Sequence, residues 1–313
     1  MDRLETWEPG STSRTGIAVQ PEALREDVMA LAVDIGERNL RDTLRARRLG
    51  LTRDYLVQRL ESAGYAVKLH GYEAGGHRVE NVEAELPGTS YPDEVLVVGA
   101  HYDSAHGSPG ANDNGSAVAS LLALAGLFQV GAMPRPARTV RFVAFATEEQ
   151  PFTRTPEMGS FAYARRCRER HEDIRAMLSL ETLGSYAHAH RWPEGPFPLN
   201  LYSPLRGDFF AVVGNLASRA LVRRCVAAFP QGPGARCAGV ALPGLLPGVK
   251  SSDHWSFWQH GYPAVMLTDT GPLRYRHYHR HSDILDRVDF TTLATVTTGL
   301  VSVVRELATG EPV

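Results

Sequence analysis

The chain reads EVLVVGAHYDSAHGSPGANDNGS from Glu94 to Ser116, and this stretch decides the fold that we expect. It begins with an apolar run over 95–100, and a short apolar run bounded by turn residues is typical of a buried strand. A loop rich in Gly, Ser and Pro follows, and a stretch of small and apolar residues then predicts a helix over 116–130. A buried strand that leads into a helix favours an α/β fold.

Three side chains suited to metal binding lie where this strand ends. His101 and Asp103 follow the apolar run directly, and Asp113 stands just before the predicted helix. In open α/β sheets, ligands bind outside the carboxyl ends of the strands, which is where these polar side chains would lie. Imidazole and carboxylate groups suit zinc or a similar divalent ion. The sequence therefore indicates a metal site at this end of the strand.

The segments on either side alternate between strand-like and helix-like patterns. Strands are predicted at 65–72, 79–86, 139–146, 176–180, 200–203 and 263–267. Helices are predicted at 24–35, 52–63, 159–169, 209–229, 252–260 and 291–307, and surface loops at 188–198 and 231–250. This alternation predicts the α/β class, with a mainly parallel, mixed β-sheet sandwiched between helices. We expect a flexible N-terminal arm over 1–19 and a single globular domain over 20–313.

Composition and charge narrow the class of protein. The formal net charge of −2 gives no reason to expect nucleic acid or an anionic membrane as a partner. The three cysteines, Cys167, Cys225 and Cys237, are too few and too widely spaced for a disulfide framework or a CxxC zinc motif. No window approaches the roughly 18 apolar residues of a membrane span, and the N-terminus lacks the apolar core of a signal peptide. We expect a cytoplasmic protein, or a secreted one if a leader precedes this sequence. The sequence does not predict an oligomeric state.

Further polar clusters follow the other strand-like runs. Glu148 and Glu149 follow the run at 139–146, Glu181 follows 176–180, and His279 follows 263–267. Taken singly, each has an ordinary explanation: adjacent glutamates are usually a solvated loop, Asp-Asn-Gly is usually a turn, and a histidine is as often a core residue as a ligand. Parallel neighbouring strands would instead bring all of them to one rim of the sheet. The combination is far more specific for a metal-dependent active site than any member is.

The ordered motifs resemble those of the co-catalytic zinc aminopeptidases of metallopeptidase family twenty-eight, whose relatives include glutaminyl cyclases and glutamate carboxypeptidases. The motifs are GAHYDS, GANDNGS, FATEEQ, LETLG, SSDHWSFWQHGYPAVMLTD and HYHRHSD. They occur in the family's order between about Asn81 and Asp289, so the resemblance covers most of the chain. It implies a zinc-exopeptidase-like fold and two zinc ions as the cofactor, with Mn or Co as alternative divalent metals.

The resemblance also implies which residues bind metal. Asp113 would bridge the two ions, His279 and Glu149 would complete one site, and His101 and Glu181 would complete the other. Position 181 holds Glu where most aminopeptidases of this group have Asp, and the longer side chain leads us to expect that this site binds its metal more weakly. Within HYHRHSD, His279 is assigned as the ligand because its four-residue separation from Asp283 matches the family pattern.

Three further residues receive roles from the resemblance. Glu148 would be the general base. Asp103 would accept the other ring N–H of His101 and fix its tautomer, as is usual for metal-bound histidines. Tyr278 matches a position where some relatives place a tyrosine that supports the oxyanion. Relatives also have a cis peptide bond after the bridging aspartate, so we expect Asp113–Asn114 to be cis.

The residues suit these implied roles chemically. Three carboxylates and two neutral imidazoles offset most of the charge of two divalent ions, and a carboxylate can bridge because it has two oxygens. Gly107, Pro109 and Gly110 provide the sharp turning that returns the chain to the same spot. Metals roughly 3.5–4 Å apart polarise a scissile carbonyl and lower the pKa of a bridging water. Glu148 could then take a proton from this water and pass it to the leaving amine.

The sequence thus predicts a zinc metallopeptidase that acts as an aminopeptidase on a peptide or an aminoacyl small molecule. A glutaminyl cyclase, which uses one zinc ion, is the alternative, and a non-catalytic binding module is disfavoured because every ligand position and Glu148 hold competent residues. A carboxypeptidase would need a basic pocket for the substrate's carboxylate, and sequence alone does not place the arginines. The segment 150–157 is longer than the family's usual link, and its Phe152 could line the mouth of the substrate site.

Overall fold

An eight-stranded sheet forms the centre of the computed structural model, which describes residues 18–129, 133–191, 206–207, 209–230, 236–246, 248–269 and 271–309. Within these ranges the strand order is β1-β2-β4-β3-β5-β10-β8-β9. The bounds are β1 (Val67–Ala74), β2 (His77–Leu86), β3 (Tyr91–His101), β4 (Arg138–Phe145), β5 (Asp173–Glu181), β8 (Phe209–Asn215), β9 (Arg236–Leu242) and β10 (Ala264–Thr268). The two short strands β6 (Ala187–Arg191) and β7 (Arg206–Gly207) pair separately.

The directions of the strands confirm the predicted mixed sheet. Four pairs are parallel (β3 with β4, β3 with β5, β5 with β10, and β8 with β9), whereas β1 with β2, β2 with β4, and β8 with β10 are antiparallel. The central strand β3 is parallel to both of its neighbours. Its two faces are therefore covered, and its apolar sequence is that of a strand buried on both sides.

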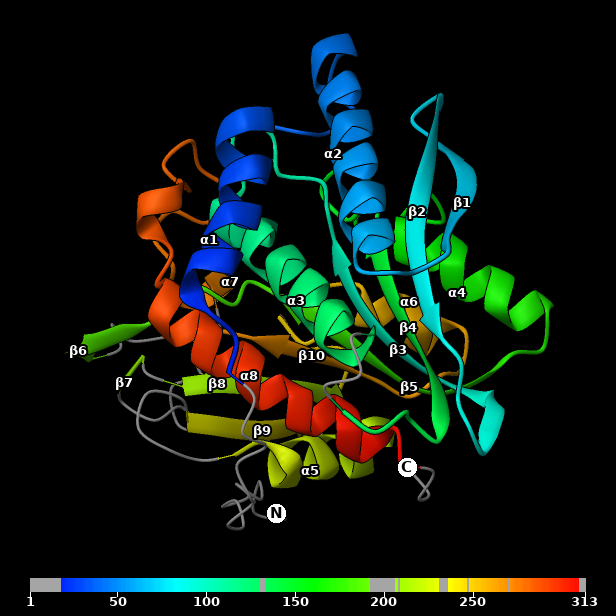
Figure 1. The fold of residues 1–313 in the computed structure, drawn as a ribbon. Coiled ribbons are helices and arrows are strands. Elements are labelled where there is room, and N and C mark those ends of the chain that lie inside the picture. The colour runs from blue at the N-terminus through cyan, green and yellow to red at the C-terminus, as the bar shows by residue number, and fades with distance from the viewer. Residues whose placement is uncertain are drawn as a thin grey trace.

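Helices cover both faces of the sheet (Figure 1). Their bounds are α1 (Pro21–Met29), α2 (Thr43–Ser62), α3 (Ala117–Gln129), α4 (Gly159–Glu169), α5 (Arg219–Ala228), α6 (His254–Gln259), α7 (Gly271–Arg274) and α8 (Phe290–Leu307). Short π-helical turns occupy Ala30–Ile35 and Ala111–Ser116, and 3-10 turns occupy Leu216–Ser218 and Leu285–Arg287. None of the helices in these ranges combines the length and the apolar composition that a membrane span requires.

The alternation of side chains along β3 separates two hydrophobic layers. Leu96 and Val98 belong to the larger apolar cluster, which includes buried residues of α1, α2, α3, α5 and α8. Val95 and Val97 belong to the smaller cluster, which includes Phe257 of α6 and residues of α4. Successive side chains of a strand point to opposite faces, so one apolar run anchors both helical layers.

The crossover connections place a binding site at the end of β3. The chain passes from β3 through α3 to β4, and from β4 through α4 to β5, which pairs with the other edge of β3. Because α3 and α4 belong to opposite layers, the connections diverge at the carboxyl end of β3. Ligands of open α/β sheets bind at such a switch point.

The segment predicted as one helix over 209–229 is instead a strand, a 3-10 turn and a shorter helix. Phe209–Asn215 forms β8 between β9 and β10, and the Asn215 side chain accepts a hydrogen bond from the Ser218 N–H at 2.8 Å before α5 begins. An apolar run without a polar face is compatible with either a helix or a buried strand, and here its neighbours in the sheet decide. The helix prediction was wrong over β8.

Three other boundaries differ from expectation. The surface loop predicted over 231–250 contains β9, an edge strand of the main sheet, and the loop predicted over 188–198 begins within β6. Helix α2 begins at Thr43 rather than near residue 52, because the Asp42 carboxylate accepts a hydrogen bond from the Arg45 N–H at 3.0 Å and caps it. The predicted strand at 200–203 and most of the predicted arm, residues 1–17, lie outside the described residues.

Candidate metal centre

The five predicted ligands come together at the carboxyl edge of the parallel strands. His101 is the last residue of β3 and Glu181 is the last residue of β5. Glu149 follows β4 by four residues, Asp113 lies in the π-helical turn before α3, and His279 lies beyond α7. Segments separated by almost 180 positions in the chain therefore contribute to one place in the fold.

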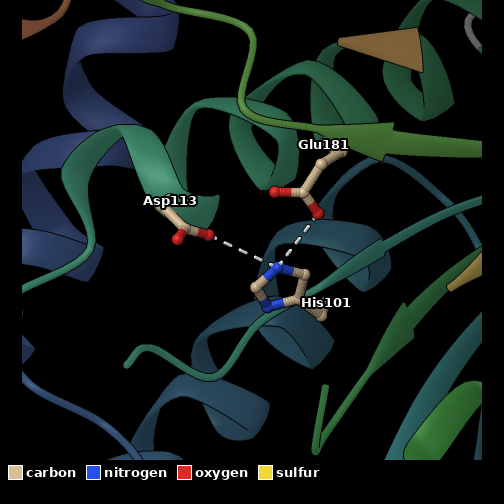
Figure 2. A group of neighbouring side chains, drawn as sticks. All are labelled: His101, Asp113 and Glu181. Carbon is tan, nitrogen blue, oxygen red and sulfur yellow. Dashed lines mark ion pairs between the residues drawn. The ribbon is translucent and has the colours of Figure 1, made fainter. Parts of the chain in front are cut away.

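One group consists of His101, Asp113 and Glu181 (Figure 2). The Nε2 atom of His101 lies 3.5 Å from Asp113 Oδ1 and 3.4 Å from Glu181 Oε2. All three side chains are buried, and their candidate ligand atoms lie within 4.8 Å of one another. Three groups directed at one small volume are the arrangement that a metal ion requires.

A second group consists of Asp113, Glu149 and His279. The Nε2 atom of His279 lies 3.1 Å from Asp113 Oδ2 and 3.2 Å from Glu149 Oε2. Asp113 therefore offers one oxygen to each group, which is the geometry of a bridging carboxylate. The neighbouring His277 does not belong to either group, since its Nδ1 atom lies 2.9 Å from the hydroxyl of Ser282.

The donor atoms are suited to cations and lack other partners. Among the described residues, both carboxylate oxygens of Asp113 and Oε1 of Glu149 are buried without a hydrogen-bond partner. Burial, together with the nearby negative charge of Asp113, holds the pKa of Glu149 well above its usual value. Buried anions without partners are costly, and bound divalent cations would offset this cost. The residues present thus fit a pair of zinc ions, which prefer His and carboxylate ligands.

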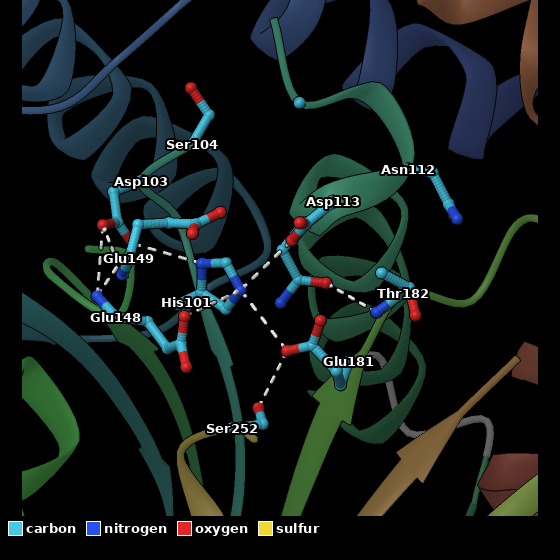
Figure 3. Close-up of polar contacts among 12 residues, drawn as sticks. His101, Asp103, Ser104, Asn112, Asp113, Glu148, Glu149, Glu181, Thr182 and Ser252 are labelled. Carbon is cyan, nitrogen blue, oxygen red and sulfur yellow. Dashed lines mark hydrogen bonds and ion pairs between the residues drawn. The ribbon is translucent and has the colours of Figure 1, made fainter. Parts of the chain in front are cut away.

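The side chain of Asp103 links His101, at the end of β3, to the backbone of Glu148 and Glu149 (Figure 3). Its Oδ1 atom lies 3.1 Å from His101 Nδ1, so that Nε2 of the ring faces the predicted metal ligands. The same carboxylate accepts hydrogen bonds from the backbone N–H groups of Glu148 at 3.0 Å and Glu149 at 3.1 Å. Asp103 thereby connects the end of β3 to the loop after β4.

Glu148 is buried beside the first group and keeps a free oxygen. Its Oε2 atom lies 4.0 Å from His101 Nε2, and its Oε1 atom has no hydrogen-bond partner among the described residues. Burial raises the pKa of Glu148 well above its usual value, and the neighbouring Glu181 carboxylate raises it further. A carboxylate with such a pKa is suited to accepting a proton.

Tyr278 stacks on the ring of His279, with the ring centroids 3.9 Å apart. Burial and the negative charges of Asp113 and Glu181 raise the pKa of Tyr278 well above its ordinary value. The hydroxyl therefore stays protonated at neutral pH and can donate a hydrogen bond. Its predicted role at the oxyanion stays a prediction.

The backbone around Asp113 is held by side chains from other segments. The Asp113–Asn114 bond is cis, as the resemblance implied. The Asp283 carboxylate accepts the N–H groups of Asn112 at 2.9 Å and Asp113 at 3.0 Å. The Asn114 side chain accepts the N–H of Thr182 at 2.9 Å and so connects this turn to the end of β5. These contacts fix the position from which Asp113 reaches both groups.

Two residues near the centre, Ser252 and Arg38, make contacts that sequence reasoning missed, and Asp253 is buried beside Ser252. The Ser252 hydroxyl donates a hydrogen bond to Glu181 Oε2 at 2.8 Å, and no side-chain hydrogen bond caps α6. Asp253 is buried, and burial raises its pKa to about 7. Arg38 is buried, and its guanidinium donates to the carbonyl oxygens of Tyr102 and Gly110, on either side of the loop between His101 and Asp113. These contacts join segments that are far apart in the chain, so no local sequence pattern predicts them.

Comparisons with known proteins agree with this geometry. A sequence profile described as Peptidase family M28 matches residues 81–304. The Escherichia coli (strain K12) protein YfbL, named as uncharacterized, is 33% identical over 90% of this chain and 87% of its own length. A probable zinc metalloprotease of Pyricularia oryzae is 28% identical over 88% of this chain, and leucine aminopeptidase 1 of Arthroderma otae is 28% identical over 73%. The chain spans only 59% and 58% of the lengths of these two fungal proteins.

Solved structures share the fold at low sequence identity. The LapA aminopeptidase of Legionella pneumophila superposes with a TM-score of 0.71 at 16% identity, covering 93% of this chain and 72% of that one. The zinc aminopeptidase of Bacillus subtilis gives 0.67 at 13% identity, covering 94% and 97%. The glutaminyl cyclase of Bacteroides thetaiotaomicron gives 0.67 at 16% identity, covering 92% and 98%. The aminopeptidase and cyclase structures are thus nearly equidistant from this chain, so the fold does not distinguish the two activities.

Proposed function

Because the chain belongs to peptidase family M28, we propose that it is a zinc-dependent aminopeptidase that releases the N-terminal residue of a peptide or an aminoacyl amide. The names of the fungal relatives, a probable zinc metalloprotease and a leucine aminopeptidase, support this proposal. So does the arrangement of carboxylates and imidazoles at the end of β3.

We propose that two ions bind, with Asp113 shared between them. His101 and Glu181 would complete one site, and Glu149 and His279 would complete the other. Bound zinc polarises the scissile carbonyl and lowers the pKa of water. Each side chain is already directed at its site, so little rearrangement of the chain is needed on binding.

Glu148 supplies the proton transfer in this mechanism. Its free carboxylate oxygen takes a proton from the attacking water and delivers it to the nitrogen of the leaving amine. Asp103 keeps Glu148 in place through its backbone N–H, and Tyr278 offers a protonated hydroxyl near the carboxylates. A water molecule, a base and a polarised carbonyl are the three components that amide hydrolysis needs.

The observation that carries the proposal is the pair of buried, unpartnered oxygens of Asp113, one facing each group of ligands. A structural carboxylate in the core would be hydrogen-bonded. A carboxylate that faces a histidine on either side and lacks a hydrogen-bond partner is best explained by two cations.

The test is metal analysis and hydrolysis of leucinamide by the wild type and Glu148→Gln. We expect the wild type to bind two equivalents of zinc and to release leucine, and the variant to retain the zinc and lose turnover by a factor of about 10² or more. Glu169→Gln, an exposed glutamate of α4, is the matched control and should keep full activity. Full turnover in Glu148→Gln would contradict the assignment of the base.

The same experiment separates the alternative activity. A glutaminyl cyclase would bind a single zinc ion and convert an N-terminal glutamine into a ring with release of ammonia. We therefore include a glutaminyl peptide in the substrate panel. One equivalent of zinc with cyclisation and no release of a free amino acid would replace the aminopeptidase proposal.

A cytoplasmic location also stays a proposal. All three cysteines lie within the described residues and are buried, and Cys167 and Cys225 form no disulfide. Burial raises the pKa of Cys167 and Cys225 to about 12, which keeps these thiols protonated and unreactive. Unpaired thiols are usual in a reducing compartment.

A further inference from the structure

A cavity of about 480 Å³ is lined in part by Pro151 and Phe152, which follow the candidate ligand Glu149 in the chain. This volume is within the range of ligand pockets. Its lining includes apolar and charged side chains from three separate loops: Leu40, Arg41, His106, Pro151, Phe152 and Glu157. No part of the mechanism above uses this cavity.

The walls of the cavity are held by specific contacts. The Glu157 carboxylate accepts a hydrogen bond from the Gly75 N–H at 2.7 Å, which fastens the turn of the β1–β2 hairpin to the loop after β4. The ring of Phe152 packs against the same turn, since a Cβ atom placed at Gly75 would lie 3.0 Å from it. The segment 150–157 thus builds one side of a formed pocket.

The cavity adjoins the predicted catalytic groups through short connections. The Phe152 N–H donates to the carbonyl of Glu149 at 2.8 Å, and the Thr153 hydroxyl donates to the carbonyl of Glu148 at 2.6 Å. Pro151 and Phe152, which line the cavity, therefore lie close to Glu148 and Glu149 in the same loop. Another lining residue, His106, lies three positions after Asp103, whose carboxylate accepts hydrogen bonds from the N–H groups of both glutamates.

The cavity and the metal centre differ in charge, since the cavity lining has one cation and one carboxylate whereas the metal centre is rich in carboxylates. Arg41 is exposed at the cavity, and its side chain forms no ion pair with the residues that the structure describes. The only carboxylate among the lining residues, Glu157, is engaged by the Gly75 N–H. The metal centre, by contrast, gathers five carboxyl groups, which belong to Asp103, Asp113, Glu148, Glu149 and Glu181.

We propose that this cavity is the subsite for the residue on the C-terminal side of the cleaved bond, and that Arg41 binds the free carboxylate of that residue. The amino end of a zwitterionic dipeptide is drawn to the acidic centre, its second side chain packs on Leu40, Pro151 and Phe152, and its carboxylate meets the unpaired guanidinium. The preferred substrates are then dipeptides with an apolar second residue. This inference rests on the proposed function, which it extends from the reaction to the substrate class.

The test compares leucyl-phenylalanine, its C-terminal amide and leucinamide as substrates of the zinc-loaded protein. We expect kcat/KM of the wild type to favour the dipeptide over its amide roughly five- to tenfold, as a partly exposed, charge-assisted pair provides. In Arg41→Met this ratio should fall to about one, whereas kcat/KM for leucinamide should not change. Arg41→Lys keeps the charge without the planar fork and should give an intermediate ratio.

The matched control is Arg47→Met, an exposed arginine on α2 outside the cavity, which should leave the ratio unchanged. An unaltered preference in Arg41→Met, or an equal loss on all three substrates, would overturn the inference. Calorimetric titration of zinc-loaded Glu148→Gln with the dipeptide and its amide measures the subsite without turnover. If the wild type hydrolyses none of the substrates, the proposed function fails, and equal affinities for the dipeptide and the amide in this titration would then reject the subsite as well.

Discussion

At the scale of single residues, Arg38 shows how much of the centre depends on a side chain that binds no metal. Its guanidinium donates to the carbonyl oxygens of Tyr102 at 2.6 Å, Pro109 at 2.7 Å and Gly110 at 3.1 Å. Burial lowers its pKa to about 10, against the opposing effect of Asp103 and other carboxylates, so the group remains charged at neutral pH. One buried cation thus fixes the loop that separates two predicted ligands.

Arg38→Lys should lower the free energy of unfolding by about 1–3 kcal/mol, because an ammonium cannot reach all of these carbonyls and leaves some of them buried without a donor. Urea denaturation measures the change. Arg47→Lys, on the exposed side of α2, is the control and should stay within about 0.5 kcal/mol of the wild type. Equal stability of the two variants would show that the carbonyls find other donors.

The ligands themselves were accessible from sequence, whereas the residues that support them were not. His101, Asp113 and Glu181 follow or adjoin strand-like runs in motifs whose order identifies the family, and the structure brings them together. Ser252 and Arg38 act through contacts between distant segments, which no local pattern of residues encodes. Predicting them requires the path of the chain in space.

At the scale of elements, Glu83 of β2 connects the hairpin to the helix α4. Its carboxylate accepts a hydrogen bond from the Tyr163 hydroxyl at 2.7 Å and lies 3.0 Å from His70 Nε2. Burial raises the pKa of Glu83, but the hydrogen bonds from His70 and Tyr163 and the charge of Arg141 outweigh it and bring the pKa to about 2. The folded state therefore favours the charged carboxylate.

A carboxyl whose pKa is lower in the folded than in the unfolded chain stabilises the fold above its unfolded pKa, near 4.5, and loses that contribution as the pH falls toward 2. Glu83→Gln should thus be less stable than the wild type at pH 7, by up to about 3 kcal/mol, and the difference should shrink between about pH 4.5 and pH 2. Unfolding curves across this range provide the measurement, with the exposed Glu61→Gln as control. A difference that is independent of pH would contradict this role.

Gly214 of β8 packs closely against α5 and β10, a contact that does not follow from the predicted helix. A Cβ atom at Gly214 would lie 2.6 Å from Val222 Cγ2 of α5 and 3.4 Å from Val265 Cγ1 of β10. Gly214→Ala should therefore cost about 1–3 kcal/mol of unfolding free energy through overpacking. Gly244→Ala, where a Cβ would meet no atom within 4 Å, is the control and should be neutral. A neutral Gly214→Ala would argue against this packing of α5 on β8.

The strands near β3 were predictable because turns and polar residues bound their apolar runs. The assignment failed at β8 because the predicted helix ran through Gly214 and Asn215, the pair at which the strand ends. It failed at β9 because Gly and Pro on both sides of a short strand resemble a loop. In the structure, β8 pairs with β10 and β9 pairs with β8. Both strands are therefore stabilised by tertiary contacts that the local sequence does not encode.

At the scale of the whole molecule, the metal centre joins segments from both helical layers and from the C-terminal third of the chain. Removal of zinc by a chelator should lower the midpoint of thermal unfolding by about 5–15 °C, because ligands that bind only the folded state stabilise it and the apo centre leaves buried carboxylates unbalanced. Re-addition of zinc should restore the midpoint. Asp113→Asn, which removes the shared carboxylate, should respond far less to the chelator. An unchanged midpoint in the wild type would indicate that the site holds no structural metal.

His279 follows β10, the last of the described strands along the chain, so the predicted ligand set is completed late in synthesis. On the proposed assignment, a copy still being synthesised carries every other ligand before this histidine emerges. On that assignment, a copy whose chain stops before His279 lacks one ligand of the second group and is therefore inert.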